Sequence, residues 1–143
     1  MKRVAIVLSF FLLAACTPKT PEAVADQFVD LYFVVIDQKR ALDLTSGLAR
    51  QKLEEELTLV EKVRTTYDQD QAKPSIFYVR RSSKVMGDHA RLSYDITIRQ
   101  GHDETLRNAL VSAERVGGKW TIANFMVREG HLPVAPGSAK AKP

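Results

Sequence analysis

Cysteine and histidine are the side chains best suited to metal binding or nucleophilic chemistry, and this chain has few of them. It holds three histidines and a single cysteine, Cys16. His89 and His102 fall in or beside predicted turns, and His131 lies near the C-terminus. None has a second histidine or a carboxylate at ligand spacing on one helix face. We expect no metal site and no catalytic cysteine. The sequence also lacks a phosphate-binding loop and a serine nucleophile elbow, so we expect no cofactor and no catalytic residues.

Cys16 follows a segment with the features of a secretory signal. Lys2 and Arg3 give the chain a basic start, and residues 4–15 carry no charge. Spanning a bilayer takes about 20 apolar residues, so this run is too short to serve as a transmembrane helix. The pattern predicts a cleaved signal peptide over residues 1–15.

The residues Leu13-Ala14-Ala15-Cys16 closely resemble the bacterial lipobox, in which the cysteine becomes the first mature residue. The resemblance implies a diacylglycerol thioether on Cys16 and acylation of its amine, which together make a stable membrane anchor. It also implies the outer membrane of a Gram-negative host, facing the periplasm, because an Asp at the position of Thr17 would retain the protein at the inner membrane. The alternative is an ordinary signal peptide cut at a nearby alanine.

The composition after residue 15 is that of one folded domain. Residues 16–143 suit a single core, and no second cysteine is present to form an internal disulfide. The chain has 21 basic and 17 acidic residues, and without Lys2 and Arg3 the excess falls to +2 (19 minus 17). This weak positive charge predicts no nucleic-acid partner. We divide the remainder into a lipidated tether (16–21), a domain (22–129) and a disordered tail rich in Pro, Ala, Gly and Lys (130–143).

Helical periodicity extends from residue 22 to about residue 68. Thr20 and Pro21 are typical of a helix start. The run 31–36 is apolar all round, which predicts burial on several sides. A short second helix is expected near residues 41–44 and a third over residues 48–67. The first helix carries one apolar stripe, made of Val24, Phe28, Leu31 and Val35.

After Pro74 the period changes to two, which predicts strands over residues 76–84, 89–100, 106–116 and 119–128. Tight turns between them predict an antiparallel meander. A two-residue turn at Gly117-Gly118 would place Leu110 opposite Phe125 and Ala109 opposite Met126. In that register Trp120 and Met126 share the face that the first helix covers, and Phe125 lies on the other face. Neither face is purely polar, so we expect the second to meet a partner, a second copy or a ligand.

This order of elements resembles the NTF2-like fold, a cone-shaped α+β domain. The segments PEAVADQF (21–28) and ALDL (41–44) look like the opening of small NTF2-like lipoproteins of unknown function. The segment GKWTI (118–122) is similar to their last strand. The resemblance covers residues 21–128 and implies N-terminal helices packed on a curled antiparallel four-stranded sheet. A cystatin-like helix plus β-meander is the alternative.

NTF2-like domains share a pocket between the curled sheet and the helices. The resemblance implies a ligand pocket whose lining we expect to include Tyr32, Tyr78, Trp120 and Met126. In enzymes of this fold Asp, His, Tyr or Arg lie inside the cone, and the candidates here are Tyr32, Asp37, Tyr78, Tyr94 and Asp95. Core packing is the default for Tyr32 and Tyr94, solvation or capping of the next turn for Asp37, and a surface ion pair for Asp95. No spacing unites a base with an electrophile.

These features predict a membrane-anchored periplasmic lipoprotein acting as a non-enzymatic binding module for a protein partner or a small apolar ligand. One alternative is a small hydrolase or isomerase using an acidic residue in the cone. Another is a structural subunit of an envelope assembly. The expected partners are the membrane, through the N-terminal lipid, and a second copy or an envelope protein, through the sheet face.

Overall fold

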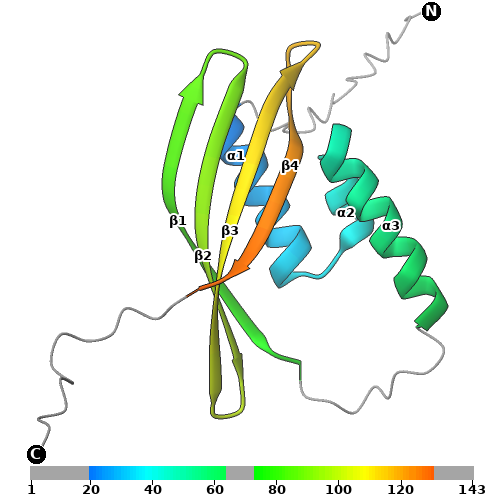
Figure 1. Ribbon diagram of the computed structural model, residues 1–143, viewed down its shortest axis with the longest axis vertical. Helices are drawn as coiled ribbons and strands as arrows, with labels where there is room; N and C mark the ends of the chain where they lie inside the picture. Colours follow the sequence, from blue (N-terminus) through cyan, green and yellow to red (C-terminus); the bar gives the residue numbers. More distant parts are fainter. Residues whose placement is uncertain (1–19, 64–72, 131–143) are drawn as a thin grey trace, which may run out of the picture.

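The computed structural model describes residues 20–63 and 73–130 (Figure 1). The predicted signal peptide, the predicted lipidation site Cys16 and the predicted tail beyond Gly130 lie outside the described residues. A helical half precedes four strands. The elements are α1 (Pro21–Val29), the π-helical turn η1 (Asp30–Val34), α2 (Gln38–Leu42), α3 (Gly47–Val63), β1 (Ser75–Met86), β2 (His89–Gln100), β3 (Asp103–Val116) and β4 (Lys119–Glu129).

The strands form one antiparallel sheet in the order β1-β2-β3-β4, which confirms the predicted meander. Helix α1 lies across one face of the sheet, and α3 lies beside the edge formed by β4 (Figure 1). Alternate residues of β2 face α1, and Leu92, Tyr94 and Ile96 are all buried there. No described helix covers the opposite face, which we call the outer face. The architecture is therefore α+β, with helices on one side of a four-stranded sheet.

The start of α1 agrees with the prediction, and its end does not. The Thr20 hydroxyl accepts a hydrogen bond from the Ala23 amide at 3.1 Å, so it caps the helix. Within η1 the helix widens, and the Val35 amide donates to the Asp30 carbonyl at 2.9 Å. This π turn rotates the following residues away from the core. Leu31 is buried, but Val35 is 53% exposed, so the prediction that residues 31–36 are buried is wrong.

A bulge in β4 also corrects the predicted register. Near the turn the pairing is as expected, with Ala113 opposite Ile122. Next along the strands Ser112 pairs with Asn124, so Ala123 is an extra residue, and every later side chain changes face. Phe125 therefore points into the core and is 6% exposed, whereas Met126 lies on the outer face and is 43% exposed. The prediction that α1 covers the face of Trp120 is confirmed, but Met126 does not share that face.

Helix α3 is held against β4 by polar contacts at the strand edge. The Lys52 ammonium donates to Asn124 Oδ1 and to the Phe125 carbonyl, both at 2.9 Å. Before α3, Thr45 forms a parallel bridge with Ile122. These bonds occupy part of the β4 edge, which would otherwise offer unpaired backbone groups to another strand.

Candidate functional site

Large side chains occupy the space between α1 and the sheet, where the pocket was expected. Phe28, Leu53 and Tyr94 have no exposed surface. The ring centres of Phe28 and Tyr32 lie 5.2 and 5.0 Å from the ring centre of Phe125. Among the described residues, no buried side-chain nitrogen or oxygen lacks a hydrogen-bond partner. This part of the interior is a packed core.

A carboxylate–tyrosine pair joins α1 to the sheet. The Tyr94 hydroxyl donates to Asp26 Oδ1 at 2.8 Å, and Arg80 donates to the other carboxylate oxygen at 2.8 Å. The Tyr78 hydroxyl approaches the Asp26 carbonyl at 3.5 Å. Burial, and then the hydrogen bond to Asp26, raise the pKa of Tyr94 well above its usual value. Tyr94 is therefore a neutral donor at physiological pH, and the cluster stabilises the packing of α1 on the sheet.

A second carboxylate–tyrosine pair joins η1 to α3. The Tyr32 hydroxyl lies 2.8 Å from Glu56 Oε2 and 3.1 Å from Oε1. Gln38 at the start of α2 donates to the same carboxylate at 3.4 Å. Burial, and then the hydrogen bond to Glu56, raise the pKa of Tyr32 far above its usual value. This cluster joins the middle of η1 to the middle of α3.

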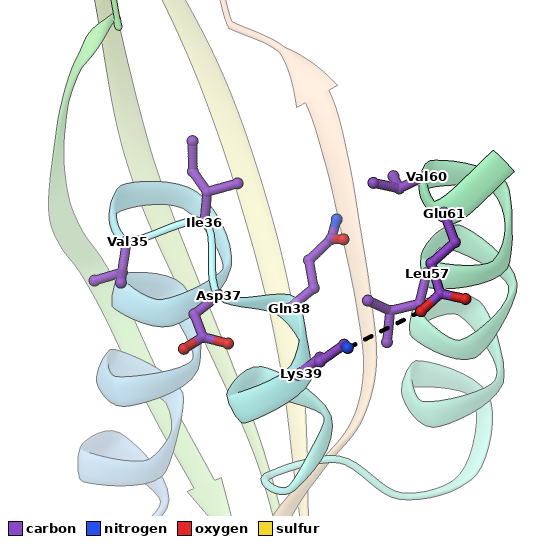
Figure 2. A pocket seen from close by; sticks show the side chains of 8 residues that line it. All are labelled: Val35, Ile36, Asp37, Gln38, Lys39, Leu57, Val60 and Glu61. Atoms are coloured by element: carbon purple, nitrogen blue, oxygen red, sulfur yellow. Dashed lines mark ion pairs between the residues drawn. The ribbon is translucent and has the colours of Figure 1, made fainter. Parts of the chain in front are cut away.

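Next to this cluster, a groove of about 360 Å³ opens between the η1–α2 connection and α3. Figure 2 shows Leu57 and Val60 extending from α3 toward the space beside Ile36 and Gln38. The Lys39 ammonium lies 4.0 Å from a Glu61 oxygen and spans the groove. The lining combines four apolar with four polar residues, namely Val35, Ile36, Leu57, Val60, Asp37, Gln38, Lys39 and Glu61.

Ile36, which lines the groove, has an unusual backbone conformation. Its φ angle is +57°, in the left-handed region that β-branched residues rarely adopt. The Asp37 amide donates to the Leu31 carbonyl at 2.8 Å, which closes the helix end around this residue. Glycine is the common residue at such a position, because other side chains add strain. The fold therefore holds an exposed isoleucine in a strained conformation at the groove.

The four residues predicted to line a ligand pocket do not come together. Tyr32 lies in the aromatic core beside the groove, and Tyr78 lies where β1 meets α1. Trp120 is buried near the β3–β4 turn, with the Arg115 guanidinium 4.8 Å from its ring centre. Met126 lies on the outer face because of the bulge. These four residues therefore lie in separate parts of the structure and do not line one pocket.

The candidates for acid–base chemistry are engaged in structural contacts. Asp37 accepts a hydrogen bond from the Arg40 amide and caps α2. Asp95 lies on the outer face and accepts from Arg81 and from Asn108. Arg80 and Arg81 point to opposite sides of the sheet, as expected from strand geometry. Each of these carboxylates acts here as a local acceptor that organises its neighbours.

Sequence reasoning missed the two acids that accept the tyrosine hydrogen bonds, although both have a detectable spacing. Glu56 stands three residues after Leu53 and four before Val60, so it shares their helix face despite lying in a run of glutamates. Asp26 is four residues after Glu22, whose carboxylate accepts from the Ser83 hydroxyl at 2.6 Å. That hydrogen bond lowers the pKa of Glu22. The two acids Glu22 and Asp26, four residues apart, therefore indicate the side of α1 that packs against β1.

Histidines and acids do not gather into a ligand set within residues 20–63 and 73–130. No group of three or more His, Cys, Asp or Glu in those ranges has the arrangement of a metal site. His89 lies 3.7 Å from Glu114, which is its cross-strand neighbour, and His102 is exposed at a turn. In the same ranges, no helix is long and apolar enough to cross a membrane.

Comparison with known proteins identifies the fold. No family model and no curated protein matches the sequence. A crystal structure from Thiobacillus denitrificans, described as a calcium/calmodulin-dependent protein kinase type II association domain, superposes with a TM-score of 0.58. The match covers 80% of this chain and 98% of that one, at 13% identity. The fold is NTF2-like. This result favours the NTF2-like expectation over the cystatin-like alternative.

A designed β-sheet protein solved by NMR also matches, with a TM-score of 0.29 and 23% identity over 57% of this chain and 89% of that one.

The NTF2-like domain of this chain has its α1-facing interior packed with aromatic and aliphatic side chains. Outside this interior, a groove of about 360 Å³ lies at the end of η1 and α3.

Proposed function

We propose that this protein is a lipid-anchored envelope protein whose NTF2-like domain binds a protein partner without catalysing a reaction. The lipobox-like segment Leu13-Ala14-Ala15-Cys16 supports the anchor, since it follows a short uncharged run that begins after two basic residues. The placement that goes with this anchor is the periplasmic side of the outer membrane, as Thr17 implies.

The observation that carries the binding role is the groove between Ile36 and Val60. Val35, Ile36 and Val60 are 53%, 58% and 39% exposed, an unusual density of apolar surface within a few residues. Asp37 and Glu61 at its border supply charges that select among partners. We assign the groove to apolar side chains of a partner protein. Its strained isoleucine wall agrees with a functional constraint, because such strain is often found at binding sites.

Site-specific photocrosslinking tests the groove. A photoreactive amino acid at Val60 should give a discrete adduct in intact membranes, and the adduct should disappear when Leu57→Glu is added. Leu59 provides the matched control, because it lies on the same helix, is 62% exposed and does not line the groove. Equal adducts from positions 59 and 60 would contradict the assignment. A small apolar ligand would instead appear as extra mass retained on the protein in native mass spectrometry.

The outer face of the sheet supports a second candidate, assembly with another copy or with an envelope subunit. Val79, Leu110 and Met126 are 54%, 47% and 43% exposed on this face. A depression of about 180 Å³ lies between β2, β3 and β4 beside Leu110 and Met126. Self-adducts from a photoreactive residue at position 110, with none from position 60, would favour assembly over the groove.

A further inference from the structure

One end of the sheet combines exposed apolar and basic side chains. The β1–β2 and β3–β4 turns lie at the same end of the molecule as the N-terminus of α1 (Figure 1). Val85, Met86 and Val116 beside these turns are 49%, 44% and 57% exposed. Three exposed cations accompany them. We call this group the hairpin rim, consisting of Lys84, Val85, Met86, Arg91, Val116 and Lys119.

The cations of the hairpin rim form no ion pairs with neighbouring acids among the described residues. Lys84 lies directly opposite Arg91 in the sheet, where paired Cβ atoms are about 5 Å apart and like charges repel. Of the acids nearby, Asp88 lies 3.8 Å from Arg115. Glu114 lies 3.7 Å from His89, which is charged only when protonated, and Glu22 accepts a hydrogen bond from Ser83. Among the described residues, no ion pair reaches the three rim cations. Within the described residues, the rim therefore presents three cations without an ion-pair partner next to apolar surface.

The hairpin rim also lies close to the point where the chain would be anchored. The Ser83 hydroxyl, one residue before Lys84, donates to Glu22 in the first turn of α1 at 2.6 Å. Cys16 precedes the helix cap Thr20 by four residues, which can span at most about 14 Å. A lipid on Cys16 would thus keep the rim within reach of the bilayer surface.

We infer that the hairpin rim docks on the anionic phospholipid headgroups of the membrane that holds the anchor. This inference rests on the proposed lipid anchor. Apolar residues flanked by Lys and Arg are typical of surfaces that enter the headgroup region without crossing it. The groove lies at the other end of α1 and η1, whose 14 residues span about 20 Å. Docking at the rim would therefore orient the groove away from the membrane and toward a periplasmic partner.

Vesicle binding of the unlipidated chain tests this directly. Residues 16–143 with Cys16→Ser should bind phosphatidylcholine vesicles containing phosphatidylglycerol, and should not bind phosphatidylcholine alone. Each rim cation near the surface contributes about five-fold in affinity. Lys84→Gln with Arg91→Gln should therefore weaken binding about 25-fold, and salt should weaken the unsubstituted chain. Equal binding to neutral and anionic vesicles would overturn the inference.

A control with the same change in charge lies at the far end of the sheet, where Lys73 precedes β1 and Arg99 pairs with Glu104 at 2.6 Å. Lys73→Gln with Arg99→Gln removes the same two residue types, and Arg99 stands eight residues beyond Arg91 on β2, about 26 Å away. At physiological ionic strength charges are screened over about 8 Å, so this variant should bind within about two-fold of the unsubstituted chain. A loss of vesicle affinity equal to that of the rim variant would show a general charge effect and refute docking through the hairpin rim.

A labelling experiment gives a second readout that does not depend on charge variants. Cys16 is the sole cysteine, so Met86→Cys in the Cys16→Ser chain carries one thiol for a polarity-sensitive dye. Its emission should shift to shorter wavelength on anionic vesicles, and that of Phe77→Cys at the far end should not. If the wild type is lipidated but the dye at Met86→Cys shows no shift, docking is refuted and the anchor stands. If the wild type is unmodified but the dye at Met86→Cys shifts, the anchor is refuted and binding by the rim stands.

Discussion

Phe125 lies opposite Val111 in the pairing of β3 with β4, and both side chains enter the core between the sheet and α1. The extra residue Ala123 produces this relationship, because it reverses the side-chain alternation of β4 after the bulge. Phe125 then meets Phe28 from α1, with 5.2 Å between ring centres. The Lys52 ammonium lies 5.4 Å from the centre of the same ring. Phe125 thus connects α1, α3 and the sheet.

Phe125→Ala should lower the free energy of unfolding by about 3–5 kcal/mol, as expected for a buried aromatic residue. Met126→Ala, one residue later on the exposed face, should cost less than about 1 kcal/mol. Chemical denaturation monitored by circular dichroism measures both. The opposite ranking would mean that β4 pairs without the bulge.

Tyr94→Phe should cost about 1–2 kcal/mol at neutral pH, because it removes a hydrogen bond to the Asp26 carboxylate while Arg80 still pairs with that group. Tyr78→Phe is the control, since its 3.5 Å contact is long, and it should cost less than about 0.5 kcal/mol. Equal losses from the two variants would argue against a special role for the Asp26–Tyr94 bond.

Stability should also fall at alkaline pH. The pKa of Tyr94 in the folded state is raised above its unfolded value of about 10. Its contribution is therefore complete below pH 10 and is lost as the pH rises from 10 toward the folded-state pKa. Denaturation midpoints between pH 8 and 11 should decline for the wild type, and the decline should be shallower for Tyr94→Phe. An identical alkaline profile for the two proteins would contradict this.

Ile36→Gly should raise the free energy of unfolding by about 0.5–1 kcal/mol. Relief of the left-handed strain contributes about 1–2 kcal/mol, and the greater freedom of glycine in the unfolded chain offsets part of it. Val35→Gly should instead destabilise, because Val35 has an ordinary right-handed backbone at φ −78°. Thermal denaturation of both variants gives the comparison, and a loss of stability in Ile36→Gly would show that its φ angle carries no strain.

The intact mass of the protein extracted from membranes should exceed that of residues 16–143 by a diacylglycerol, with or without a third acyl chain. Cys16→Ser should release the protein from the membrane or leave it as an uncleaved precursor. Mass spectrometry and membrane fractionation measure the two effects. A wild-type protein recovered in soluble, unmodified form would rule out the anchor.

Local sequence patterns were enough to predict the elements of the fold. Thr20 and Pro21 predict the start of α1, because a side-chain cap and a preset φ angle act within one helical turn. The alternation Leu92, Tyr94, Ile96 predicts which face of β2 is buried, and the glycine pair at residues 117–118 predicts the last turn. Each of these signals depends only on neighbours in the chain, so the order of elements and the α+β class follow from them.

Only the tertiary structure decided the register beyond Ala123, the π turn at Asp30–Val34 and the groove. A bulge or a widened helical turn costs little locally and has no reliable signature in the sequence. Packing between distant segments selects it, here by placing Phe125 against Phe28. The hydrogen bonds of Asp26 with Tyr94 and of Glu56 with Tyr32 likewise join residues 68 and 24 positions apart. Helical spacing can show which face such an acid occupies, but its partner depends on how the helices lie on the sheet.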